Sequence, residues 1–188
     1  MPFIGNKPSA VPLTSADIAD SIITSAKIAD GTIVNADINA SAAIAGTKIS
    51  GSFGKVLQVV SATYNTQETT SSNSYVTSNL TVSITPSSAS NKILVFASAV
   101  IATSGTATHN GVTLYRNSTN LSTDDSMAHS YGDAGSVRCN IGVHYLDSPA
   151  TTSSTAYTIY FKAGSGAHAQ YIHINDSMSV ITAIEIAG

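Results

Sequence analysis

Charged side chains are scarce in this chain of 188 residues, because Asp, Glu, Lys and Arg together make up 10% of it, against about 25% in an ordinary globular domain. Eight Lys and Arg stand against eleven Asp and Glu, giving a net charge of −3. So few cations form no basic patch for a phosphate backbone, and nucleic-acid binding is therefore excluded from the expected functions.

Cysteine and long apolar runs are equally rare. Cys139 is the single cysteine, which excludes an intrachain disulfide framework. It falls on an apolar face, so we expect it to pack as a small hydrophobe and not to act as a nucleophile. No apolar run approaches the roughly 18 residues of a membrane span, and residues 1–8 lack a signal-peptide pattern. We therefore expect no membrane insertion, and synthesis in a host cytoplasm.

A large apolar residue recurs at every fifth position near the N-terminus, with one extra residue before the last two members. A period of five suits neither a lone helix nor a lone strand, because neither keeps such a row on one face. The row is Leu13, Ile18, Ile23, Ile28, Ile33, Ile38, Ile44 and Ile49.

Two architectures would bury this row. The small-x-large pattern, as in Ala16-Asp17-Ile18 and Ala26-Lys27-Ile28, resembles the pentapeptide-repeat solenoid, in which one chain coils around itself. Solenoids need several stacked units and capped ends, and this row is too short to supply them. The sequence therefore favours a stalk over residues 13–52 in which several chains intertwine, and which is unfolded in a monomer.

Alternation with period two replaces the five-residue rule after residues 51–54, which places a domain boundary near residue 52. Clusters of Ser, Thr, Asn, Gly and Pro separate the alternating segments. Eight short strands without helical periodicity predict a mainly β head over 53–188, an eight-stranded β-sandwich of jelly-roll-like form. The expected strands are 55–64, 75–85, 92–103, 111–117, 136–146, 155–163, 169–175 and 178–187.

The parity of each strand predicts its inward face. The last strand runs to the final residue, so we expect it to belong to the core. The expected inward residues are Leu80, Val82, Ile84, Ile93, Val95, Ala97, Ala99, Ile101, Val137, Cys139, Ile141, Val143, Tyr145, Tyr157, Ile159, Phe161, Val180, Thr182, Ile184 and Ile186.

No constellation for catalysis, metal binding or a cofactor is found. The five histidines lack the i, i+2 or i, i+4 spacing that directs two imidazoles at one metal ion. Asp124 and Asp125 are neighbours in an expected loop, where adjacent side chains point apart, unlike the facing carboxyl groups of glycosidases. We therefore expect a protein that is not an enzyme and carries neither metal nor cofactor.

The longest connection, 118–135, is the best candidate for recognition, because long loops in compact β domains are usually functional or disordered. It mixes aromatic, imidazole, carboxylate and hydroxyl groups, which suits binding to sugar hydroxyls. Packing on a neighbouring subunit is an equally strong explanation for such a loop. With histidines from the shorter loops 104–110 and 164–168, the receptor-binding candidates are Met127, His129, Tyr131, Asp124, Asp125, His109 and His168.

Residues 24–33, Thr-Ser-Ala-Lys-Ile-Ala-Asp-Gly-Thr-Ile, resemble the stalk repeats of tailed-bacteriophage tail fibres. Segments 54–60, 84–95, 114–118 and 184–187 are similar to the β-sandwich head that follows such stalks. The resemblance implies a homotrimer whose stalk core is Ile18, Ile23, Ile28, Ile33, Ile38, Ile44 and Ile49. It also implies that the N-terminus docks on other virion proteins and that the head faces host-surface glycan or protein.

The resemblance supplies no catalytic residue, and 188 residues is short for a whole tail fibre. Residues 1–12 form a rigid, apolar opening suited to docking on the virion. The expected function is that of a virion-located trimeric tail fibre or appendage that recognises the host surface. The alternative is an architectural virion protein, such as a capsid decoration fibre or a baseplate or fibre connector, whose head binds viral neighbours.

Overall fold

The computed structural model describes residues 18–19, 21–39, 41–42, 44, 55–105, 108–132, 135–164 and 168–188. The chain divides into two units, Met1–Gly51 and Ser52–Gly188. The described residues contain β-strands and short 3-10 turns but no α-helix. None of their helical segments is long and apolar enough to cross a membrane.

One backbone turn closes in each pentad of the first unit between Ala19 and Ala42. Its 3-10 turns are η2 (Ser25–Lys27) and η3 (Asn35–Asp37). Left-handed φ angles occur ten residues apart, at 66° for Ser21 and 77° for Gly31, so turns of two kinds alternate. The N–H to C=O hydrogen bonds run from Ile22 to Ala19, Lys27 to Thr24, Thr32 to Ala29, Asp37 to Val34 and Ala42 to Asn39.

The isoleucine row is exposed in the single chain. Ile18, Ile23, Ile28, Ile33, Ile38 and Ile44 expose 38–54% of their surface, and every other residue of 18–44 whose burial is described is exposed too. A solenoid made by one chain would bury its central row, so the described part of this segment is not one. Leu13, Ile49, the expected docking segment 1–12 and the expected boundary near residue 52 lie outside the described residues.

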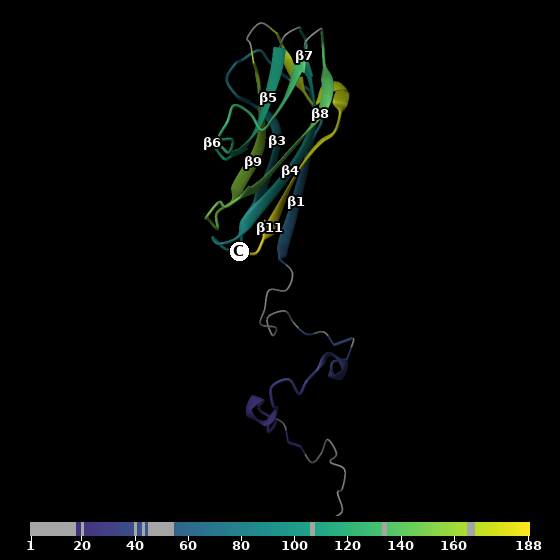
Figure 1. Ribbon diagram of the computed structural model, residues 1–188, viewed down its shortest axis with the longest axis vertical. Coiled ribbons are helices and arrows are strands. Elements are labelled where there is room, and N and C mark those ends of the chain that lie inside the picture. Colours follow the sequence, from purple (N-terminus) through teal and green to yellow (C-terminus); the bar gives the residue numbers. More distant parts are fainter. Residues whose placement is uncertain are drawn as a thin grey trace, which may run out of the picture. The chain divides into compact units, whose positions relative to one another are not determined.

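The head consists of two antiparallel sheets (Figure 1), in agreement with the mainly β sandwich predicted for it. The first sheet, sheet A, has the order β1 (Val56–Tyr64), β11 (Ser179–Ile186), β4 (Lys92–Thr103), β10 (Gln170–Ile172) and β2 (Glu68–Thr70), and β8 (Arg138–Asp147) pairs with β4. The second, sheet B, has the order β3 (Val76–Ile84), β9 (Thr155–Ala163), β5 (Thr108–Arg116) and β6 (Thr119–Asn120), and β7 (Ala128–Gly132) pairs with β5.

Each of the eight expected strands is present, but the described part of the head contains eleven, so the predicted strand number is wrong. The additional strands are β2, β6 and β7, which have three, two and five residues. Segments this short show little or no alternation. Two of them, β6 and β7, lie within 118–135, so this segment is partly strand and not one long loop.

The core lies between the sheets, and most predicted inward faces are confirmed. Alternate residues of β3, β4 and β9 are buried, and Ile141 and Val143 of β8 join them. Val137, Cys139 and Tyr145 are half-buried. Cys139 and Tyr145 pack against the core cluster, so the thiol has the packing role expected from the sequence.

The predicted face of β11 is wrong. Val180, Thr182, Ile184 and Ile186 are half-buried and alternate with buried Ser179, Ile181, Ala183 and Glu185. The strand is apolar on both faces, and the carboxylate of Glu185 made the true core face look polar. Its charge is accommodated by hydrogen bonds from Gln58, Ser87 and Asn91 at 2.6–2.8 Å. Burial alone would raise the pKa of Glu185, but these hydrogen bonds lower it to about 2.

Candidate functional site

A surface cavity of about 470 Å³ gathers five of the seven predicted receptor-binding residues. It is lined by His109, Asp124, Asp125, His129 and Tyr131, together with Ser126. We call this cavity the histidine cavity. Its lining combines two imidazoles, two carboxylates, a phenol and a hydroxyl, so it offers hydrogen-bond donors, acceptors and an aromatic face.

Strand pairing explains how the imidazoles and the phenol share one surface. His109 of β5 lies opposite Tyr131 of β7, and Gly111 lies opposite His129. The intervening Asn110 and Ser130 are buried. Because side chains alternate along a strand, His109, His129 and Tyr131 all lie on the outer face of sheet B, and Tyr131 is 56% exposed.

The segment 121–127 is fastened to the same face at Asp125. The ammonium of Lys162, from β9, forms an ion pair with the Asp125 carboxylate and lies 4.9 Å from the centre of the Tyr75 ring. The Tyr75 hydroxyl donates a hydrogen bond to the Asp125 carbonyl oxygen. Side chain and backbone of this one aspartate are thus both held, which positions the acidic wall of the histidine cavity.

Electrostatics keep this arrangement in one protonation state. The pKa of the Asp125 carboxyl is lowered mainly by the hydrogen bond from Lys162, and the nearby imidazoles of His109 and His129 lower it further. Burial, together with Asp125 and Tyr115, raises the pKa of Tyr75 to about 12. At neutral pH the carboxylate is charged and the phenol remains a hydrogen-bond donor.

Two glycines make room for this site. A Cβ atom at Gly164 would lie 2.0 Å from the His109 ring, and one at Gly111 would lie 3.2 Å from the Lys162 side chain. A larger residue at position 164 would therefore displace the imidazole. At position 111 it would press on the lysine that holds Asp125.

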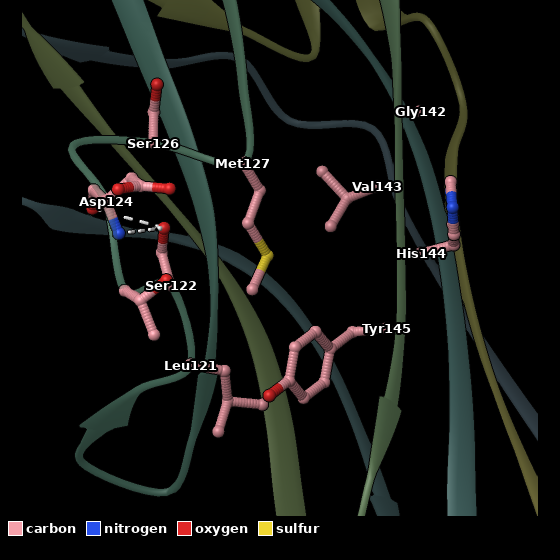
Figure 2. A pocket seen from close by; sticks show the side chains of 10 residues that line it. Leu121, Ser122, Asp124, Ser126, Met127, Gly142, Val143, His144 and Tyr145 are labelled. Carbon is pink, nitrogen blue, oxygen red and sulfur yellow. Dashed lines mark hydrogen bonds between the residues drawn. The ribbon is translucent and has the colours of Figure 1, made fainter.

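A second cavity, of about 340 Å³, lies between 121–127 and β8 and shares Asp124 and Ser126 with the first. In Figure 2 the side chains of Leu121, Met127 and Tyr145 converge in it, and His144 lies on the other side of its strand. Its lining combines these side chains with the polar Ser122, Thr123, Asp124 and Ser126. Met127, the sixth predicted residue, belongs to this cavity.

His168 lines neither cavity. It lies against Gly105, where a Cβ atom would lie 2.3 Å from its ring. The sequence also missed Lys162 and Tyr75, although they position Asp125. Lys162 is one of only eight Lys and Arg residues and stands within a predicted strand, which is the signal that would have drawn attention to it.

Among the described residues, no group of three or more His, Cys, Asp or Glu side chains is arranged to hold a metal ion.

No family model matches the chain, and no curated protein matches it either.

Two solved structures show a distant likeness. The structure of the Gx strain of infectious bursal disease virus matches with a TM-score of 0.41 and 16% identity, over 70% of this chain and 32% of that one. The structure of T=1 particles derived from infectious bursal virus matches with a TM-score of 0.41 and 13% identity, over 69% of this chain and 36% of that one. The chain thus spans about a third of each matched structure, and likeness at this level carries no argument about function.

Proposed function

We propose that this protein is a virion structural protein, a homotrimeric tail fibre or tail appendage of a tailed bacteriophage. Its N-terminus docks on other virion proteins, its stalk joins three chains, and its head recognises glycan or protein of the host surface. The head acts by adhesion and performs no chemistry. Three copies multiply weak individual contacts into useful avidity.

The observation that carries the recognition step is the histidine cavity. Hydroxyl-rich ligands are bound by directional hydrogen bonds and by stacking on aromatic rings, and His109, His129 and Tyr131 supply both on one sheet face. The ion pair of Lys162 with Asp125 fixes the opposite wall before any ligand arrives, which lowers the ordering cost of binding.

Binding of the intact protein to an array of bacterial surface glycans, and to cells of candidate host strains, tests this proposal. His109→Ala and Tyr131→Ala should each weaken binding at least tenfold. His168→Ala is the matched control, because it removes an imidazole outside both cavities, and its binding should equal that of the wild type. Point variants are preferable to replacing 118–135, since that replacement would remove β6 and β7.

The alternative role, an architectural virion protein, makes the opposite prediction. Such a protein would bind neither glycans nor cells, and virions lacking it would fail to assemble. That combination would overturn the adhesion proposal and favour a capsid decoration fibre or a connector.

A further inference from the structure

The outer face of sheet A exposes large apolar side chains among polar ones. β1, β11, β4 and β8 run side by side in the head (Figure 1). One row across the four strands contains Val59, Ile184, Leu94 and Leu146, and the next row contains Ser61, Thr182, Phe96 and His144. Val59, Phe96 and Leu146 are 59%, 46% and 49% exposed.

The outer face of sheet B differs. The outward positions of its strand β3 are all polar and exposed: Thr77, Asn79, Thr81 and Ser83. An antiparallel sheet that faces water normally has such a polar face. Large apolar side chains exposed together on one sheet face indicate instead a surface that another protein covers.

The charge on the outer face of sheet A fits a second copy of the same chain. The outward residues of its four long strands include no Asp or Glu among those that the structure describes. Lys92 and Arg138 lie at opposite ends of β4 and β8. Two identical faces can therefore meet at their centres without burying a charge.

The same face has a hollow of about 260 Å³, lined by Phe96, Ala97, Ser98, Val180 and Thr182. A neighbouring copy that covers this hollow would bury the ring of Phe96, which is 46% exposed in the single chain. Contacts that repeat in this way close into a ring when the rotation between copies is one third of a turn.

The position of the exposed apolar residues along the sequence also favours a second copy of the chain as the partner. The exposed isoleucine row reaches Ile44, and exposed apolar residues resume at Val56 and Leu57, where β1 begins. Chains brought together by the row would hold their heads at high effective concentration.

The area of the face sets the strength expected of this contact. Four strands about 4.8 Å apart and about nine residues long give roughly 500 Å², below the roughly 800 Å² per partner of a standard interface. The contact is therefore too small to assemble separate heads and depends on the stalk.

We propose that the outer face of sheet A is the surface through which the three heads of one trimer contact each other. This inference rests on the trimer of the proposed function but not on what the histidine cavity binds. It leaves the outer face of sheet B, with that cavity, directed away from the sister chains.

Cross-linking of the full chain tests the contact. Ser98→Cys and Ser83→Cys, each made with Cys139→Ala, place one exposed thiol on the outer face of sheet A or of sheet B. With a short bis-maleimide at low protein concentration, Ser98→Cys should give covalent dimers in at least tenfold greater yield than Ser83→Cys. Equal yields from proteins that sediment as trimers would overturn this inference and leave the proposed function intact.

A second pair of variants keeps the test independent of the thiols. Phe96→Glu would place a carboxylate in the apolar contact, so the full-length trimer should lose several degrees of its unfolding midpoint, and Ser83→Glu should lose none. Circular dichroism checks that both variants fold. Equal midpoints for the two variants would contradict the head contact, and a monomeric wild-type chain would overturn it together with the trimer.

Discussion

The buried imidazole of His173 forms hydrogen bonds to residues of both sheets. Its Nε2 atom lies 2.9 Å from the carbonyl oxygen of Ser78, which accepts only, so Nε2 carries the proton. Nδ1 then accepts from the Ser179 hydroxyl at 2.7 Å, and the edge of the ring packs on Tyr64. Burial lowers the pKa of His173 below its usual value of 6.5, so the neutral form persists at neutral pH.

His173→Ala should lower the free energy of unfolding by about 2–4 kcal/mol, since it opens a cavity and leaves two buried polar groups unpaired. Chemical denaturation at fixed protein concentration measures this change, and His129→Ala, which removes an exposed histidine, should stay within about 0.5 kcal/mol of the wild type. Because the folded pKa is lowered, the unfolded chain takes up protons first, and wild-type stability should fall as the pH drops through 6.5. A wild-type protein as stable at pH 5.5 as at pH 7.5 would contradict this account.

Because of Glu185, the stability of the fold should fall a second time, at a more acidic pH. Its folded pKa of about 2 lies below the usual 4.5, so its stabilising contribution is complete above pH 4.5 and is lost as the pH falls toward 2. Glu185→Gln should be less stable than the wild type at pH 7 but should lose less on acidification from pH 4.5 to 2.5. Thermal unfolding midpoints across this range give the comparison, and parallel curves for the two proteins would exclude the role of the carboxylate.

At the scale of elements, the ion pair of Lys162 with Asp125 holds the segment 121–127 in place but contributes little to the stability of the sandwich. Exposed ion pairs contribute little to global stability, and the Asp125 side chain is 66% exposed. Lys162→Met should therefore leave the unfolding midpoint nearly unchanged while cleavage within 121–127 during limited proteolysis becomes at least several times faster. Lys92→Met, on the other sheet, serves as the control, and equal cleavage rates in the two variants would contradict the fastening.

Strand β11 is expected to be indispensable, because it lies between β1 and β4 and its inward residues are buried. Deletion of residues 179–188 should prevent folding, seen as loss of soluble protein and of the β-sheet circular dichroism signal. Deletion of Gly188 alone is the control and should fold. A soluble, folded product from the longer deletion would show that the strand is dispensable.

Much of the head could be predicted from the sequence, because alternation reports strands with one dry and one wet face. That signal located β3, β4 and β9 with their inward residues. It failed for β11, where both faces are apolar and Glu185 lies inward. It also placed His109 and Tyr131 only in separate loops, since the pairing of β5 with β7 that joins them is a long-range contact. The ion pair of Lys162 with Asp125 was missed for the same reason.

At the scale of the whole molecule, apolar surface remains uncovered in both units of the chain. In the first unit it is the isoleucine row, and in the second it is the outer face of sheet A. Hydrophobic burial is the main force available to cover such surface, and the nearest source of matching surface is a sister chain. The trimer is proposed as the state in which both are covered.

Sedimentation velocity of the intact chain at micromolar concentration tests this claim most directly. We predict one species with three times the mass of a single chain, and a shift toward monomer when Ile28 and Ile33 are both replaced by Asp. A folded single chain at that concentration, with its isoleucine row in water, would contradict the account.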